Sequence, residues 1–128
     1  MIEVDESELP VLRIRWPSEP VGAAEIDRFA LAMERAHASG RIAVIVDATR
    51  AAPIGLRAFA RIVSIERRMD PRMLAARAIV VPSALAVRVL AAALARIPHR
   101  VPTRAFDDPS EAERWARAEL ARAQATQP

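Results

Sequence analysis

The chain has 128 residues, 52% of them hydrophobic, with 19 basic and 16 acidic side chains and a net charge of +3. This length and composition predict a single domain over residues 1–128 and exclude a disordered chain. Because cysteine is absent and the two histidines are far apart, the sequence predicts neither disulfides nor a metal site.

Two short strands and a helix are predicted for the first third of the chain. Apolar and charged residues alternate at residues 2–5 and again at 12–16, and the short connection between them predicts an antiparallel hairpin. Between residues 21 and 39 the apolar residues recur every three or four positions, as on one face of an amphipathic helix. Gly40 is the residue type that commonly follows the end of such a helix.

Two buried strands, each followed by a helix, are predicted for the middle of the chain. Residues 42–46 and 78–81 are continuous apolar runs, which favour strands covered on both faces. Helices are expected at residues 55–69, where a proline at position 71 ends the pattern, and at residues 83–97. The inward-facing residues of the later helix are Val87, Leu90, Leu94 and Ile97.

A last strand and a last helix complete the pattern. Pro102 lies within the strand predicted at residues 101–106 and indicates a sheet edge, because proline cannot donate a backbone hydrogen bond. Asp108 is expected to cap the following helix, which buries Trp115. The end of the chain, about residues 124–128, is expected to fray.

The order of the predicted elements is ββαβαβαβα, which defines an α/β protein. Its mixed β-sheet is opened by an antiparallel hairpin and is accompanied by about four helices. Alternating strands and helices predict parallel strand pairs joined by right-handed crossovers. We expect the helices to lie mainly on one side of this sheet.

No segment predicts export or membrane insertion. Residues 1–10 are acidic, which is opposite in charge to the start of a signal peptide. The longest apolar stretch, residues 84–95, is interrupted by Arg88 and is too short to span a bilayer. We therefore expect a soluble, cytoplasmic protein.

No catalytic or cofactor-binding motif is recognisable. Three glycines and no lysine exclude the glycine-rich phosphate loops of nucleotide enzymes. None of the serines stands in a nucleophile elbow, and Ser83 and Ser110 are explained as helix starts. His37 continues an apolar helix stripe, and we interpret it as a packed or half-exposed residue at the helix end. The sequence predicts no enzyme, no cofactor and no metal.

The arginines are distributed unevenly along the chain. All 19 basic residues are arginine, a choice that we attribute to GC-rich codons. Their placement, however, is a property of this protein, because residues 1–27 hold seven acids and two arginines whereas residues 41–104 hold twelve arginines and three acids. The arginines on one solvent face of the helix predicted at 55–69, together with one that precedes it closely, are candidates for binding a partner. They are Arg50, Arg57, Arg61 and Arg68.

This arginine surface has two interpretations. Guanidinium groups suit carboxylates and phosphates, so an acidic protein partner, an anionic lipid or a phosphorylated ligand fits it. The absence of lysine and tyrosine argues against nucleic acid. The alternative is a solvated helix face that is neutralised by Glu66, Asp70 and the acidic N-terminal hairpin.

Asp47 is the strongest single polar candidate. It ends a buried strand at the carboxyl edge of the predicted sheet, where open α/β sheets place their ligand sites. Thr49 supplies a hydroxyl group two residues later, and we include both residues among the candidates for partner binding. The alternative interpretation of Asp47 is a turn or a helix-capping role in the loop that follows the strand, residues 48–50.

Two segments resemble the SpoIIAA-like, STAS/SEC14-type domains of bacteria. Residues 106–116, FDDPSEAERWA, are similar to the F-x-D-x-x-E-A-x-x-W-L pattern that ends these domains. Residues 45–49, IVDAT, followed by Gly55, Leu56 and Phe59, resemble the STAS pattern of strand, aspartate, loop, Gly-Leu and helix. The order of the elements agrees over nearly the whole chain.

The resemblance implies a mixed sheet with flanking helices and a non-enzymatic, regulatory module that binds a protein through residues 48–72. Phosphorylatable STAS antagonists carry Asp-Ser-Ser/Thr-Gly, but here Ala52, Pro53 and Ile54 precede Gly55, so no phospho-switch is implied. SEC14-like relatives bind lipids, which leaves a carrier of a lipid or small apolar ligand as the alternative. A homodimer is also left open.

Overall fold

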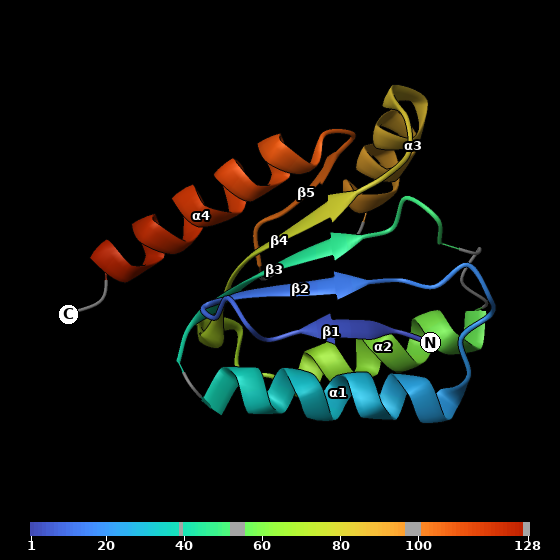
Figure 1. The fold of residues 1–128 in the computed structure, drawn as a ribbon, viewed down its shortest axis with the longest axis horizontal. Helices are drawn as coiled ribbons and strands as arrows, with labels where there is room; N and C mark the ends of the chain where they lie inside the picture. Colours follow the sequence, from blue (N-terminus) through green and yellow to red (C-terminus); the bar gives the residue numbers. More distant parts are fainter. Residues whose placement is uncertain (39, 52–55, 97–100, 127–128) are drawn as a thin grey trace.

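A mixed β-sheet forms the centre of the protein (Figure 1). The structure, a computed structural model, describes residues 1–38, 40–51, 56–96 and 101–126. Within these residues the five strands are β1 Glu3–Asp5, β2 Val11–Arg15, β3 Ile42–Asp47, β4 Leu74–Val80 and β5 Thr103–Phe106. They lie side by side in this order, with β1 antiparallel to β2 and every later pair parallel. The predicted hairpin, mixed sheet and edge strand are confirmed.

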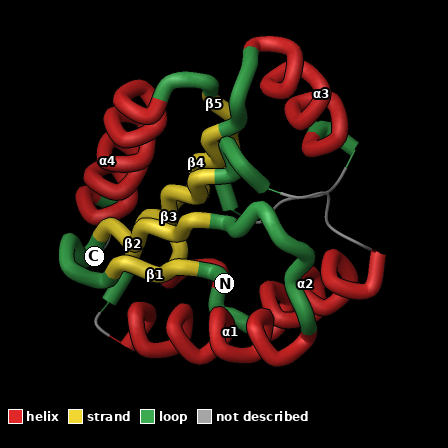
Figure 2. Tube along the Cα trace, turned by 45° about the vertical axis from the view of Figure 1, so that its right-hand side comes forward, coloured by secondary structure: helices red, strands yellow, loops and turns green. Residues whose placement is uncertain are grey.

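Helices cover both faces of this sheet. The α-helices of the described residues are α1 Ala23–Ala38, α2 Leu56–Arg68, α3 Ala84–Leu94 and α4 Pro109–Ala125. α1 and α2 lie on one side of the sheet and α4 lies on the other, while α3 lies near β5 (Figures 1 and 2). The expectation that the helices lie mainly on one side is therefore wrong. β3 and β4 carry apolar side chains on both faces, and each face needs a cover.

The two faces of the sheet build two separate clusters of apolar side chains. Strand alternation directs one set of residues toward α4 and the next set toward α1. The buried residues on the α4 side include Val11, Ala43, Ile45, Ala78 and Val80 of the strands, with Ala112, Ala116 and Leu120 of α4. Those on the α1 side include Leu12, Ile14, Ile42, Val44 and Leu74 of the strands, with Met33 and Ala36 of α1.

Trp115 is less buried than the sequence pattern suggested. Ala112 and Ala116 of α4 are fully buried, but Trp115 is half-buried and packs against the edge of the cluster. Its ring lies 5.6 Å from the ring of Phe106, measured between centroids. Trp115 therefore packs against the core as predicted but is only partly buried, because β5 is the last strand and no further strand covers its outer side.

β4 begins earlier than the apolar run at residues 78–81 predicted. It starts at Leu74, directly after a short 3₁₀ turn that the sequence pattern did not predict, Pro71–Met73. The first part of the strand could not be recognised from the sequence because Arg77 interrupts its apolar residues. In the structure Arg77 is half-buried and donates a hydrogen bond to Thr103 on the neighbouring strand.

α3 packs less deeply than predicted. None of its described residues is buried, and Val87, Leu90 and Leu94 are half-buried. Leu85 and Val89 are 69% and 63% exposed. Ile97, which was expected to continue the inward stripe, lies outside the described residues. The helix is apolar on most sides, so its periodicity could not define one buried face.

Side chains cap the helices where the sequence predicted. Asp108 accepts a hydrogen bond from the Ser110 backbone amide at 2.9 Å, and Ser83 accepts one from the Ala86 amide at 3.1 Å. Gly40 has a φ of 125°, a left-handed conformation that favours glycine at a helix end. These local contacts define the loops at the edges of the sheet.

Candidate functional site

Asp47 forms a turn with the residues that follow it. Its Oδ1 atom accepts hydrogen bonds from the Thr49 amide at 3.0 Å and from the Thr49 hydroxyl at 2.6 Å. Arg15 on β2 approaches the other carboxylate oxygen at 3.9 Å. Burial tends to raise the pKa of Asp47, but the Thr49 hydrogen bonds and the nearby Arg15 and Arg50 outweigh it and lower the pKa below its ordinary value. The geometry favours the turn interpretation of Asp47.

The candidate arginines fall into two separate groups. Arg50 is exposed beside Asp47, in the loop after β3. Arg61 and Arg68 lie on α2, where both line a groove between α2 and α1. The side chain of Arg57 lies outside the part of the chain that the structure describes. The structure therefore brings Arg61 and Arg68 together at the groove, and it places Arg50 apart from them, beside Asp47 and Thr49.

In the part of the chain that the structure describes, which leaves out the Glu66 side chain, the α2 arginines have other partners than predicted, and Asp70 pairs with Arg72. Arg61 donates to the Asp27 carboxylate on α1, with its Nε atom 2.9 Å from Oδ1. Arg68 donates to the Ser64 hydroxyl of its own helix at 3.2 Å. The acids of the hairpin do not reach α2 in the described residues. Instead Glu3, Glu6 and Glu8 pair with Arg15, Arg35 and Arg13 respectively.

The groove between α1 and α2 has a volume of about 780 Å³. Its apolar lining is formed by Ala30, Leu31, Ala60, Ile65, Met69 and Met73. Charged side chains from both helices stand along its walls, with Asp27 and Glu34 on α1 and Arg61 and Arg68 on α2. Leu31 is 55% exposed there. An apolar centre with a polar rim is the usual composition of a surface that binds another macromolecule.

His37 lies at one end of the groove. Both of its ring nitrogens are buried, and neither has a hydrogen-bond partner among the described residues. Burial lowers the pKa of His37 below its ordinary value, against smaller opposing effects of the Met73 backbone and the Asp70 carboxylate. The interpretation of His37 as a packed residue at a helix end agrees with this position. Its neutral ring adds to the apolar character of this end of the groove.

The residues of α1 that line the groove were not identified from the sequence. Asp27, Leu31 and Glu34 were not among the candidate residues, although they lie on one helix face at spacings of four and three residues. The available signal was the matching interval of seven residues between Asp27 and Glu34 and between Arg61 and Arg68. Equal intervals on two helices predict facing side chains only if the helices are neighbours, and the sequence does not show that α1 lies beside α2.

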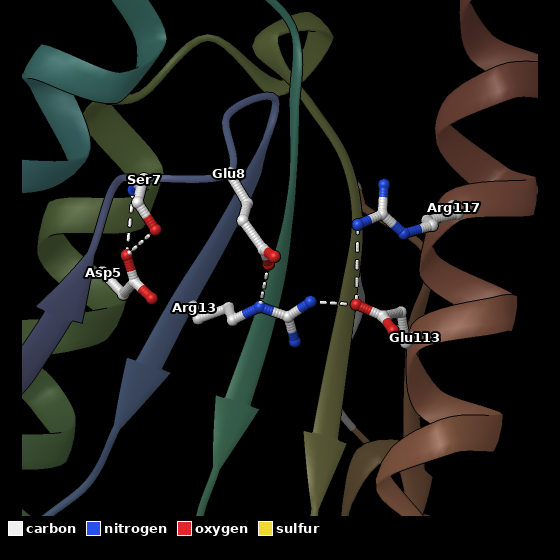
Figure 3. A network of polar contacts seen from close by, with 6 residues as sticks. All are labelled: Asp5, Ser7, Glu8, Arg13, Glu113 and Arg117. Atoms are coloured by element: carbon white, nitrogen blue, oxygen red, sulfur yellow. Dashed lines mark hydrogen bonds and ion pairs between the residues drawn. The ribbon is translucent and has the colours of Figure 1, made fainter.

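A second polar network lies on the opposite side of the sheet (Figure 3). Arg13 on β2 donates to Glu8 in the hairpin loop, at 2.5 Å, and also to Glu113 on α4. Glu113 is in addition 3.5 Å from Arg117 one turn along α4. The hydrogen bonds that Arg13 donates to Glu113 and Glu8 raise the pKa of Arg13, and the bond accepted from Arg13 lowers the pKa of Glu113. The network joins the hairpin to α4.

The described part of the chain holds neither a metal-binding cluster nor a membrane-spanning helix. Its histidines and carboxylates form no cluster that could hold a metal ion. None of its helices is long and apolar enough to cross a membrane.

The sheet order, the opening antiparallel pair and the helices on both faces define a SpoIIAA-like fold, the fold of STAS domains. No family model matches the chain, and no curated protein matches it. Among solved structures, the chain is similar to an uncharacterized protein of the DUF3478 family from Shewanella loihica PV-4, which has a SpoIIAA-like fold. The TM-score is 0.69 at 17% identity, covering 91% of this chain and 92% of the other. At this identity the likeness shows the fold, and it confirms the fold expected from the resemblance.

Proposed function

We propose that this chain is a non-enzymatic regulatory module that binds another protein in the groove between α1 and α2. The observation that carries the proposal is the composition of the groove, an apolar lining flanked by charged side chains from two helices. Leu31, which is 55% exposed, supplies apolar surface that a partner would cover. The SpoIIAA-like fold supports the regulatory role, since STAS domains act through protein contacts.

The proposed site differs in part from the surface expected from the sequence. Arg61 and Arg68 belong to it because they line the groove. Asp47 and Thr49 do not line it, and their hydrogen bonds to one another are accounted for by the turn after β3. The proposal includes no phosphorylation step at the loop before α2, because residues 52–54 are Ala, Pro and Ile.

The test compares two exposed leucines on different helices. The tagged full chain is used to capture a partner, which is then purified and titrated calorimetrically against each variant. Leu31→Glu places a charge on the apolar lining and should weaken the partner's affinity at least about tenfold. Leu85→Glu is the matched control, because Leu85 is 69% exposed on α3 and lies outside the groove. It should leave the affinity unchanged.

The same pair of variants can overturn the proposal. Both leucines are exposed, so both variant proteins should fold, which thermal unfolding checks. Unchanged binding by Leu31→Glu would exclude the groove as the docking site. Loss of binding by Leu85→Glu alone would move the site to α3.

The lipid-carrier alternative has a separate readout. The groove is open and bears four charged side chains from α1 and α2, which suits a protein surface better than an acyl chain. Native mass spectrometry of the purified protein should therefore show the bare chain mass. A co-purifying lipid that is lost from Leu31→Glu would favour the carrier over the protein-binding module.

A further inference from the structure

α1 and α2 carry two acid–arginine pairs at matching positions. The two helices lie side by side and run in the same direction, since each connects neighbouring parallel strands (Figures 1 and 2). Asp27 on α1 is hydrogen-bonded to Arg61 on α2. Seven residues later, about two helical turns, Glu34 stands on α1 and Arg68 on α2. The second pair therefore lies at the corresponding level of the groove.

The two pairs differ in how their charges are used. The first pair is closed, with the Arg61 Nε atom 2.9 Å from the Asp27 carboxylate. The second pair is open. Arg68 donates instead to Ser64 of its own helix, and within the described residues Glu34 makes no hydrogen bond or ion pair. Among the described side chains, one wall of the groove thus offers an unpaired carboxylate, and the other offers a guanidinium without a carboxylate partner.

Apolar side chains surround the open pair. Leu31 precedes Glu34 on α1, and Ile65 and Met69 lie beside Arg68 on α2. Met73 and the half-buried His37 complete the apolar part of this half of the groove, and the Asp70 carboxylate, which also lines it, is paired with Arg72. Methionine side chains are flexible and adapt to different apolar surfaces. This half of the groove therefore combines an adaptable apolar floor with one negative and one positive wall.

We infer that this half of the groove takes an amphipathic α-helix of the partner, which directs a basic side chain to Glu34 and an acidic side chain to Arg68. The inference rests on the proposed function and names the partner's chemistry. From Asp27 to His37 the groove follows α1 for about 15 Å, which equals about three turns of a docked helix. Apolar side chains three and four residues apart would reach the floor, as in other helix-in-groove complexes.

Charge complementarity selects the occupant. A helix with acidic residues on both flanks would be repelled by Glu34, and one with basic residues on both flanks would be repelled by Arg68. A helix with one flank of each sign satisfies both walls in one of its two directions, because reversing the helix exchanges its flanks and would place like charges together. The partner is therefore of mixed charge, in contrast to the acidic partner that the placement of the arginines suggested.

The test uses three synthetic helical peptides with the same apolar stripe. One has acidic residues on one flank and basic residues on the other, one is acidic on both flanks, and one is basic on both. Fluorescence anisotropy with the full chain should show the mixed peptide binding at least about tenfold more tightly than either of the others. Leu85→Glu serves as the control protein and should bind all three peptides like the wild type.

Charge reversal of each wall should change the preference in a defined way. Glu34→Arg makes both walls positive and should favour the acidic peptide. Arg68→Glu makes both walls negative and should favour the basic peptide. Both residues are exposed, so neither variant is expected to unfold.

The outcomes separate this inference from the proposed function. Equal affinity of the three peptides for the wild type, or preferences that stay unchanged in the two variants, would overturn the inference about charge. Absence of binding by all three peptides would overturn a helical occupant, even if Leu31→Glu still releases the captured partner. Retention of that partner by Leu31→Glu would overturn the proposed function itself.

Discussion

Arg13 on β2 and Glu113 on α4 are 100 residues apart in the sequence and form an ion pair across the α4 side of the sheet. Arg13 also holds Glu8 in the hairpin loop, so a single guanidinium joins three parts of the chain. This side of the sheet is the one opposite the α1–α2 groove (Figure 1). The pair contributes to stability and leaves the proposed binding surface untouched.

Replacing Arg13 should cost more stability than replacing its neighbour on the same strand. Arg13→Ala removes two charge-assisted hydrogen bonds and should lower the free energy of unfolding by about 1 kcal/mol. Arg15→Ala is the matched control, because Arg15 is 68% exposed and its two carboxylate contacts are as long as 3.7 and 3.9 Å. Urea denaturation measures both. Equal losses in the two variants would contradict a special role for Arg13.

Glu113 should make stability depend on pH in the acidic range. The hydrogen bond from Arg13 lowers the pKa of Glu113 in the folded protein below its ordinary value of 4.5. Its contribution is therefore complete above that ordinary value and is lost as the pH falls through the lower folded-state pKa. The difference in unfolding free energy between wild type and Glu113→Gln should shrink as urea denaturation is moved from about pH 7 to about pH 3. A difference that grows on acidification would show the opposite sign of the shift.

His37 should contribute a second pH dependence, nearer neutrality. Burial lowers the pKa of His37 in the folded protein below the ordinary value of 6.5. As the pH falls below that ordinary value, the unfolded chain takes up a proton more readily than the folded one, and stability declines. His37→Leu removes the two unpartnered nitrogens and should be at least as stable as wild type at neutral pH. Thermal unfolding of His37→Leu should not show this loss of stability on acidification. If the loss is unchanged, a group other than His37 causes it.

Replacing Asp47 should lower the stability of the protein and leave its affinity for the partner unchanged. Asp47→Ala removes the acceptor of two hydrogen bonds from Thr49 and should lower the free energy of unfolding by about 1 kcal/mol. Asp47→Asn keeps an acceptor oxygen and should retain most of that stability. Calorimetric titration with the captured partner should give the wild-type affinity for Asp47→Asn. A large loss of affinity in this folded variant would show that Asp47 takes part in partner binding.

Most secondary-structure elements could be predicted because the interactions that begin and end them join residues close together in the sequence. The Asp108 and Ser83 side chains bond to amides two and three residues away, and the Gly40 backbone ends α1 locally. The start of β4 could not be predicted in this way. Arg77 is acceptable inside that strand because Thr103, 26 residues later, accepts its hydrogen bond. A contact at such a separation leaves no periodic pattern in the sequence.

By itself the sequence determined the order of strands and helices, the mixed sheet and the excess of arginine in the middle of the chain. Only the tertiary structure decided which charges meet. Arg61 pairs with Asp27 on α1, whereas the hairpin acids that were expected to neutralise α2 bind arginines elsewhere. Ion pairing requires separations of a few ångströms, which the packing of α1 beside α2 sets. That packing places Glu34 and Arg68 on opposite walls of one groove.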